Sequence, residues 1–353
     1  MKNFFTNLHY KSDLTISEKV LLSLLLPFSL GYSLIAETRN FLYKVNCLKS
    51  YNPEVLTISI GNLTTGGTGK TPITATLANF LTKKGYKVAI LSRGYGSKLN
   101  SKEINVISDG EKIYYDAQIG GDEPVWLAQN CLGTVVLTSS NRVQIAKHAQ
   151  NMGCNALILD DGFQHQKLGR NINVAVVDIE KQFGNKNVLP AGPLRESFKN
   201  IKRADKIIVM NKNTSVISEE KLQALKTLIN KVNKEADISV CNAKVDKIYE
   251  IHSEEELSFN DGQSVLAFSA IGQPKQFYNL LSQSSINVLE TVDFADHHKY
   301  SAQDVERLFA IAEAQNINVL ITTEKDAVKV KDLTQKAIYA LKLGIDWDAE
   351  TIL

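Results

Sequence analysis

Short apolar runs alternate along this chain with longer stretches whose apolar residues recur at helical spacing. The runs predict strands over residues 55–60, 87–91, 134–138, 156–159, 174–178 and 206–210. The longer stretches predict helices over residues 72–84, 122–130 and 140–151. Because alternation of this kind is typical of parallel sheets, we predict an α/β fold with a mostly parallel sheet and helices on both faces. A β-hairpin is expected between residues 104–107 and 113–115, joined through Asp109-Gly110.

A second, smaller α/β unit is predicted in the last third of the chain. Its strands are expected over residues 264–268, 286–294, 317–322 and 337–342, with helices over 274–283 and 301–315. The polar stretch 211–233 predicts a surface helix between the two parts. We therefore divide the chain into an N-terminal segment (1–50), a core domain (51–235) and a smaller C-terminal lobe (236–353).

The N-terminal segment contains an apolar stretch, residues 20–36, that carries no charge and is interrupted by Pro27 and Gly31. It is slightly short for a membrane-spanning helix, which needs about 20 apolar residues. On a helical projection one stripe continues beyond it, formed by Leu34, Phe41, Leu42, Val45 and Leu48 and flanked by Arg39 and Lys44. This pattern predicts a helix that lies in a membrane interface. The alternative is a helix buried in the protein core.

Composition narrows the classes of partner. The 353 residues are 44% hydrophobic and 22% charged, which is typical of a globular protein, and the formal net charge is only +2. No bulk positive field therefore indicates nucleic acid as a partner, so any anion must be recognised by local groups. The four cysteines are scattered without paired spacing, which fits a reducing compartment.

The segment 61–71, Gly-Asn-Leu-Thr-Thr-Gly-Gly-Thr-Gly-Lys-Thr, lies between a predicted strand and a predicted helix, where a phosphate-binding loop is found in P-loop proteins. Lys70 can reach the β- and γ-phosphates of a nucleotide, and the Thr71 hydroxyl can bind Mg²⁺. The strict pattern requires glycine where Thr64 stands. The predicted nucleotide-binding residues are Gly66, Gly67, Thr68, Gly69, Lys70 and Thr71. The alternative is a glycine-rich turn without a ligand.

Two pairs of acidic residues are candidates for catalytic work. Asp160 and Asp161 follow the strand predicted over 156–159, where an acid holds Mg²⁺ in P-loop enzymes. The alternative is a helix N-cap or a turn. Asp122 and Glu123 follow two glycines at the start of a predicted helix. Asp122 could cap this helix, or it could accept the proton of a hydroxyl that attacks a γ-phosphate.

Histidines and single arginines complete the candidates. His297 and His298 stand in an acidic loop, where they could orient a carboxylate, bind a metal or simply be solvated, and their spacing alone favours solvation. Arg93, Arg142 and Arg195 each stand in a turn rich in glycine, proline or small polar residues. An arginine there suits bidentate phosphate binding, although most such arginines are simply exposed.

Together these motifs closely resemble the tetraacyldisaccharide 4′-kinase family. The matching segments occur in the expected order: Gly-Asn at 61–62, Gly-Gly-Thr-Gly-Lys-Thr-Pro at 66–72, Ser-Arg-Gly-Tyr-Gly at 92–96, Gly-Asp-Glu-Pro at 121–124, Asp-Asp-Gly-Phe-Gln-His at 160–165, Gly-Pro-Leu-Arg-Glu at 192–196, Phe-Ala-Asp-His at 294–297 and Thr-Thr-Glu-Lys-Asp at 322–326. The resemblance implies ATP- and Mg²⁺-dependent phosphorylation of the 4′-hydroxyl of tetraacyldisaccharide 1-phosphate, which gives lipid IVA in lipid A biosynthesis. It also implies a location on the cytoplasmic face of the inner membrane of a Gram-negative bacterium, without an obligate protein partner.

The resemblance also implies residue roles. It makes Asp122 the general base and His297 its partner, and it leaves His298 without a role. The residues placed on ATP and Mg²⁺ are Lys70, Thr71, Glu123, Asp160 and Asp161. The residues placed on the phosphorylated glycolipid are Arg93, Arg142, Gln164 and Arg195.

Two other classes of P-loop protein remain as alternatives. Asn211-Lys212-Asn213-Thr214 is similar to the guanine-reading N-K-x-D motif of GTPases, but threonine stands where the carboxylate is required. A partitioning-type ATPase or a soluble P-loop biosynthetic enzyme would also carry a glycine-rich loop. Neither accounts for the apolar N-terminal segment together with Asp122 and His297. Nucleotide preference and phosphorylation of a lipid acceptor would separate the three.

Overall fold

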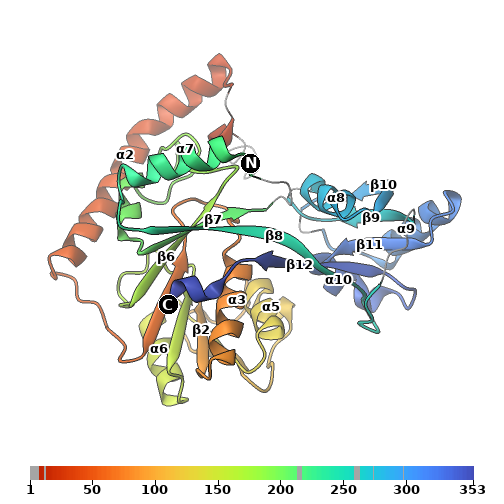
Figure 1. Cartoon of the computed structure of the whole chain (residues 1–353), viewed down its shortest axis with the longest axis horizontal. Helices are drawn as coiled ribbons and strands as arrows, with labels where there is room; N and C mark the ends of the chain where they lie inside the picture. Colours follow the sequence, from red (N-terminus) through yellow and green to blue (C-terminus); the bar gives the residue numbers. More distant parts are fainter. Residues whose placement is uncertain (1–7, 12, 213–216, 258–262, 273, 297) are drawn as a thin grey trace. The chain divides into compact units, whose positions relative to one another are not determined.

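The computed structural model describes residues 8–11, 13–212, 217–257, 263–272, 274–296 and 298–353 (Figure 1). The chain forms two compact units. The first unit contains the described residues up to Met210, together with Ser218–Val240 and Asp348–Leu353. The second unit contains Asn211, Lys212, Ile217 and Cys241–Trp347, within the described residues. The end of the chain therefore returns to the first unit. Our three-part division of the sequence stays a prediction.

The first unit is built on a mostly parallel sheet, as predicted. Its strands are β1 (Leu56–Gly61), β2 (Val88–Ser92), β3 (Asn105–Asp109), β4 (Val135–Thr138), β5 (Ala156–Asp160), β6 (Ile172–Asp178) and β7 (Lys206–Asn211). They lie in the order β7-β6-β1-β5-β2-β4-β3, and all neighbours are parallel except β3 and β4. The central strands are almost wholly buried, which explains their unbroken apolar runs.

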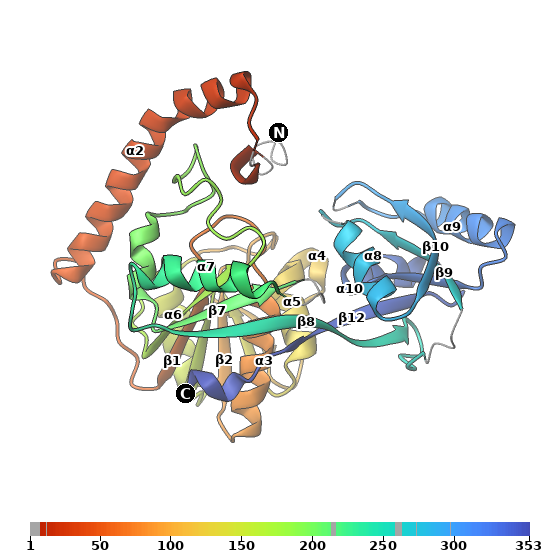
Figure 2. The same ribbon diagram turned by 45° about the horizontal axis from the view of Figure 1, so that its top comes forward.

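Helices cover both faces of this sheet. The helices of the unit are α2 (Ile16–Lys44), α3 (Lys70–Lys83), α4 (Ala117–Gly120), α5 (Asp122–Asn130), α6 (Arg142–Asn151), α7 (Glu219–Asn230) and the 3-10 segments η1 (Phe198–Arg203) and η3 (Ala349–Ile352). Buried side chains of α6 pack on Ala89, Leu91, Leu157 and Leu159. Helices α3 and α5 also contact the sheet. They lie on the face opposite α6 (Figures 1 and 2), where the alternate side chains of the same strands point.

The predicted hairpin at Asp109-Gly110 is only partly correct. The turn is present, and Gly110 has a φ of +99°. However, the second arm makes a single bridge, between Ser108 and Ile113, and β3 pairs antiparallel with β4 instead. The antiparallel partner that β3 needs is therefore supplied by a strand distant in sequence, which local alternation does not reveal.

The second unit also contains an α/β sheet, as predicted. Its elements are β8 (Asp237–Glu250), β9 (Ser264–Ser269), α8 (Pro274–Gln283), β10 (Asn287–Asp293), α9 (Ala302–Ala314), β11 (Val319–Thr323), α10 (Glu324–Val330), η2 (Lys331–Leu333) and β12 (Tyr339–Asp346). The strand order is β10-β9-β11-β12-β8, and only β8 and β12 are antiparallel. β8 begins in the first unit and continues into the second from Cys241 onward.

The sequence did not predict β8 or α10. In β8, Cys241 and Ala243 are buried at alternate positions, but the next buried residue is Ile248. The register with β12 shifts at this point, since Lys342 pairs with Lys247 and Leu343 pairs with Val245. This bulge breaks the period of two by which a strand is recognised. α10 has 7 residues, too few for helical periodicity to be visible.

Asp326 lies in the second unit beside the C-terminal ends of the parallel strands β9 and β11. The carboxylate is fully buried, accepts hydrogen bonds from the Ala270 N–H at 2.9 Å and the Thr323 hydroxyl at 2.9 Å, and pairs with Lys329 at 2.9 Å.

We predict that Asp326→Ala lowers the free energy of unfolding by roughly 3 kcal/mol, because it leaves buried donors without an acceptor. Urea denaturation measures this loss. Asp332→Ala, at an exposed carboxylate in the same region, is the control, and an equal loss in both variants would contradict the assignment.

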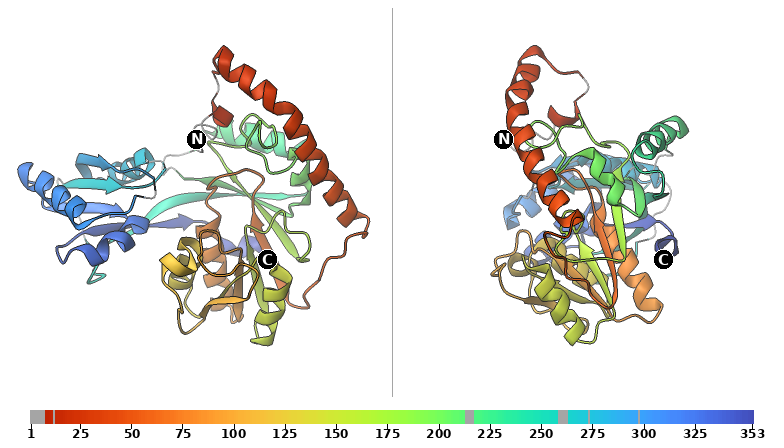
Figure 3. Two further views of the ribbon diagram at one scale, coloured as in Figure 1. Left: turned by 180° about the vertical axis from the view of Figure 1, so that it is seen from behind. Right: turned by 90° about the vertical axis from the view of Figure 1, so that its left-hand side faces the viewer.

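The helix α2 lies along the first unit (Figure 3). Most of its large apolar side chains are exposed. Thr15 and Glu18 form a capping box at its start. Its buried residues are Leu22, Ser29, Ala36 and Asn40. Among the described residues, α2 is long and apolar enough to cross a membrane, judged by length and composition alone.

The structure changes two details of the predicted N-terminal segment. The alternative of a buried core helix does not describe α2, since Leu24 is 66% exposed and Phe28 is 70% exposed. The predicted stripe is also longer than the helix. α2 ends at Lys44, so Val45 caps it and Leu48 lies beyond its end.

Candidate active site

The predicted phosphate-binding loop joins the end of β1, at Gly61, to the start of α3, at Lys70. Gly66 and Gly69 have φ values of +96° and +88°, a region that side chains other than glycine rarely enter. A Cβ atom on Gly69 would also lie 2.9 Å from the Met210 side chain. Thr68 Oγ1 is buried without a hydrogen-bond partner in the part of the chain that the structure describes. A buried hydroxyl that lacks a partner in this loop fits a phosphate ligand.

Lys70 is held in place by two oxygen atoms. Its Nζ donates to Asn62 Oδ1 at 3.2 Å and lies 3.4 Å from Asp161 Oδ1. Arg195 pairs with the same carboxylate, with its Nη1 at 2.9 Å from Oδ1 and 2.8 Å from Oδ2. Burial alone would raise the pKa of Asp161, but Lys70 and Arg195 together lower it below its ordinary value. The cluster therefore contains an ionised carboxylate between two cations.

Asp160 and Asp161 occupy different environments although they are adjacent. Asp160 ends β5, is 3% exposed, and accepts weak hydrogen bonds from Thr74 at 3.3 Å and Ser92 at 3.4 Å. Burial raises the pKa of Asp160 to about 6, and the carboxylate of Glu123 adds to this shift. Asp161 has a φ of +53°, which fits a turn rather than a helix N-cap. The negative charge of Glu123 therefore acts on Asp160 near the phosphate-binding loop.

These groups fit Mg²⁺, which proteins bind through one or two carboxylates with phosphate oxygens and water. The candidate ligands Thr71, Glu123, Asp160 and Asp161 offer hydroxyl and carboxylate oxygens, the hard ligands that Mg²⁺ prefers. Among the described residues no cluster of three or more His, Cys, Asp or Glu forms a complete metal cage. A site that shares its ion with a nucleotide does not need such a cage.

The predicted substrate arginines differ in exposure. Arg142 begins α6, is 5% exposed and donates to the Ser139 carbonyl at 3.0 Å. Burial lowers the pKa of Arg142 to about 10, and the positive charge of Arg93 adds to this effect. Arg93 itself is exposed after β2. Burial lowers the pKa of His165 to about 4, with Arg142 contributing, so this imidazole is neutral at pH 7.

Asp122 is exposed in the first turn of α5. The suggestion that it caps this helix is wrong, because the N-cap is Gly121, whose φ is +93°. His297 lies outside the described residues. His298 is partly exposed, at 31%, but it is not simply solvated, because its ring stacks on Phe294 at 4.8 Å and its Nε2 lies 3.2 Å from Asp304 Oδ2.

Sequence reasoning did not identify Glu196 and Arg203, which support the site. Glu196 is fully buried and pairs with Arg203 Nη2 at 2.7 Å. It also accepts a hydrogen bond from Gln164 Nε2 at 3.0 Å, and the same Nε2 donates to the Asn62 carbonyl at 2.8 Å. Arg195 Nη1 is 3.4 Å from Gln164 Oε1. The signal for Glu196 was its place directly after Arg195, whereas Arg203 carried no motif.

The structure therefore brings most of the predicted site residues together. Ion pairs and a hydrogen bond join Lys70, Asp161, Arg195 and Gln164 around the loop. Asp160 interacts with Glu123, and Arg142 with Arg93. The arrangement combines an anion-binding loop, paired carboxylates and several cations. These are the groups that phosphoryl transfer from a nucleotide requires.

Comparisons with known proteins agree with this chemistry. The family model for LpxK, tetraacyldisaccharide-1-P 4′-kinase, matches residues 21–353. The tetraacyldisaccharide 4′-kinase of Halothermothrix orenii is 34% identical, with 98% of this chain and 94% of the relative covered. The enzyme of that name from Syntrophus aciditrophicus is 34% identical, with 92% and 88% covered.

A solved structure gives the same answer for the fold. The crystal structure of LpxK from Aquifex aeolicus in complex with ATP is similar, with a TM-score of 0.73 and 30% sequence identity. The match covers 94% of this chain and 96% of that one. Both the P-loop core and the smaller α/β lobe lie within this match. On these grounds the chain belongs to the tetraacyldisaccharide-1-phosphate 4′-kinase family.

Proposed function

We propose that this protein transfers the γ-phosphoryl group of ATP to the 4′-hydroxyl of tetraacyldisaccharide 1-phosphate, giving lipid IVA for lipid A biosynthesis. The observation that carries the proposal is the contact of Lys70 with Asn62 and Asp161 at the phosphate-binding loop of a chain that belongs to this kinase family. The similar ATP-bound structure supports ATP as the donor. Family membership does not favour the GTPase, the partitioning ATPase or the soluble biosynthetic enzyme.

On the nucleotide side, the loop from Gly66 to Thr71 binds the phosphates, and Lys70 places its charge on the β- and γ-phosphates. Thr71, Glu123, Asp160 and Asp161 would hold Mg²⁺, which supplies charge neutralisation between the phosphate oxygens. Asp161 keeps Lys70 and Arg195 in position with a single carboxylate. Phosphate oxygens are negatively charged, as the Asp161 carboxylate is. They can therefore compete with this carboxylate for Lys70 and Arg195.

On the acceptor side, we assign Asp122 as the general base that accepts the proton of the 4′-hydroxyl. Its exposed place at the start of α5 leaves the carboxylate accessible to a substrate. His297 is assigned as its partner by the family resemblance. The acceptor's anionic and polar groups would be bound by Arg93, Arg142, Gln164 and Arg195.

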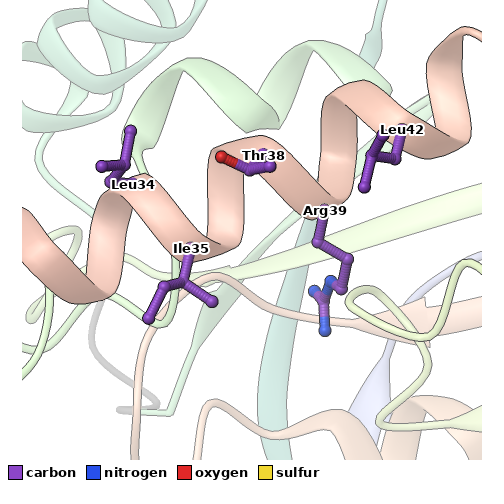
Figure 4. Close-up of a pocket in the computed structure, with 5 residues that line it drawn as sticks. All are labelled: Leu34, Ile35, Thr38, Arg39 and Leu42. Atoms are coloured by element: carbon purple, nitrogen blue, oxygen red, sulfur yellow. The ribbon is translucent and has the colours of Figure 1, made fainter.

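The protein acts at the surface of the inner membrane, and α2 is the contact. On its outward side Leu24, Phe28, Leu30 and Leu34 are exposed. An exposed apolar patch of this kind marks a site of contact with a membrane or another protein. A shallow hollow of about 360 Å³ on the helix is lined by Leu34, Ile35, Thr38, Arg39 and Leu42 (Figure 4). An exposed arginine among apolar side chains suits the boundary between acyl chains and anionic headgroups.

We predict that Leu24→Glu combined with Phe28→Glu reduces binding to vesicles made of neutral and anionic phospholipid. Two charges in the apolar side of α2 oppose its burial in the interface, while the buried residues of the helix are unchanged. Flotation of the full chain with the vesicles measures the bound fraction. Leu132→Glu is the matched control, because Leu132 is 80% exposed in a loop elsewhere in the first unit. Equal flotation of the double variant and the wild type would place the contact elsewhere.

The function is tested directly with purified protein in detergent. Mg-ATP and tetraacyldisaccharide 1-phosphate are added, and the lipid product is analysed by mass spectrometry. We expect one additional phosphate, located on the 4′-oxygen. Omission of the acceptor separates this transfer from ATP hydrolysis. ATP consumption without a phosphorylated lipid would contradict the proposed reaction.

A further inference from the structure

Three polar residues attach α2 to the loops that surround the phosphate-binding segment. Ser29 Oγ accepts a hydrogen bond from the Ala191 N–H at 2.9 Å, and Glu37 Oε1 accepts one from Asn200 at 2.6 Å. Asn40 Nδ2 donates to Glu196 Oε2 at 3.0 Å. The helix therefore differs from an ordinary surface helix, since polar Ser29 and Asn40 are buried against the protein while most of its large apolar side chains are exposed.

Asn40 differs from the other two because its partner is itself part of the candidate active site. The Asn40 side chain is buried, and its Oδ1 accepts a hydrogen bond from Gln166 while its Nδ2 donates to Glu196. Both ends of one amide are thus fixed. Each partner is close in the chain to a proposed acceptor-binding residue, because Gln166 is two residues after Gln164 and Glu196 directly follows Arg195.

Glu196 connects Asn40 to the proposed acceptor-binding residues. Its Oε1 accepts from Gln164 at 3.0 Å, and Arg203 neutralises its charge. Gln164 in turn lies 3.4 Å from Arg195, which pairs with Asp161 next to Lys70. A continuous set of contacts therefore leads from α2 to the loop. Because Glu196 is fully buried, its orientation depends on these bonds rather than on water.

We infer that Asn40 and Glu196 are positioning residues through which α2 holds Gln164 and Arg195 in their acceptor-binding orientation. The inference rests on the proposed function for the acceptor. Lys70 keeps its own contacts with Asn62 and Asp161 whether or not Asn40 is present. Loss of Asn40 should therefore affect binding of the lipid acceptor more than binding of ATP.

The test compares Asn40→Ala with Ser29→Ala in the full chain. Asn40→Ala removes the hydrogen bonds of α2 with Glu196 and Gln166, whereas Ser29→Ala removes the bond of α2 with Ala191 in the same unit and does not lead to Glu196. We expect Asn40→Ala to raise KM for tetraacyldisaccharide 1-phosphate by about tenfold, a size typical of a lost hydrogen bond to a charged group. KM for ATP and kcat should change by less than about threefold, and flotation with vesicles should be unchanged because the apolar side of α2 is intact.

A second measurement does not depend on the acceptor. Hydrogen exchange followed by mass spectrometry should show faster exchange at the peptide containing Gln164 and Gln166 in Asn40→Ala, but not in Ser29→Ala. Equal effects of the two variants on acceptor KM and on exchange would overturn the inference and leave only a general docking role for α2. Failure of the wild type to phosphorylate the lipid would instead reject the proposed function, and the exchange comparison would still decide the role of Asn40.

Discussion

Lys70→Ala should almost abolish phosphoryl transfer, lowering kcat by about 10²–10³, since the loss of one preorganised donor to developing charge costs that much in related chemistry. Lys70 starts α3 and contacts both Asn62 and Asp161, so its ammonium group is already placed at the loop. Removing it leaves the phosphates without the cation that the loop provides. Initial rates of lipid phosphorylation at saturating Mg-ATP measure the effect.

Lys84→Ala is the matched control for this variant. Lys84 caps the other end of α3 and pairs with Glu350 at 2.9 Å on the surface. An exposed pair of this kind contributes little to stability, so we expect normal turnover. Circular dichroism of both variants shows whether the fold is retained. Near-normal turnover by a folded Lys70→Ala protein would remove the assignment of the loop as the phosphate-binding site.

Asp122→Asn should lower kcat by about 10²–10⁴, the usual contribution of a general base. The substitution keeps the shape of the side chain at the start of α5, while the amide cannot accept the proton of the 4′-hydroxyl. KM for the acceptor should change less than kcat if the carboxylate acts mainly in the transition state. Single-turnover rates with the lipid acceptor separate the chemical step from product release.

Two further variants define how Asp122 works. Glu111→Gln removes an exposed carboxylate from a turn of the same unit and should leave kcat unchanged. If His297 acts together with Asp122, the double variant Asp122→Asn/His297→Ala should be little worse than the poorer single variant. Fully multiplicative losses would show that the two act independently. An active Asp122→Asn enzyme would move the base role to another group, with Asp161 the next candidate.

The sequence was sufficient where the signal is local. The buried parallel strands are continuous apolar runs, and the glycines and Lys70-Thr71 mark a strand-to-helix turn whose backbone only such residues can form. Helices α5 and α8 were predicted with their observed limits because a glycine or a proline marks their starts. The combination of motifs also indicated the family, although each motif alone is common.

The tertiary structure decided what depends on residues distant in the chain. The bulge in β8 and the pairing of β3 with β4 come from partners that no local pattern names. Asp160 and Asp161 are neighbours of the same type, yet burial raises the pKa of one and two cations lower that of the other.

Support for the site was likewise invisible in sequence. Asn40 is 156 residues from Glu196, and no periodicity connects an amide in an apolar helix to a buried carboxylate in a loop. Pattern identifies residues by what surrounds them in the chain, whereas a charge's effect depends on distance and on how much water remains nearby. The sequence alone thus determined the chemistry available at this site, and only folding determined which groups share it.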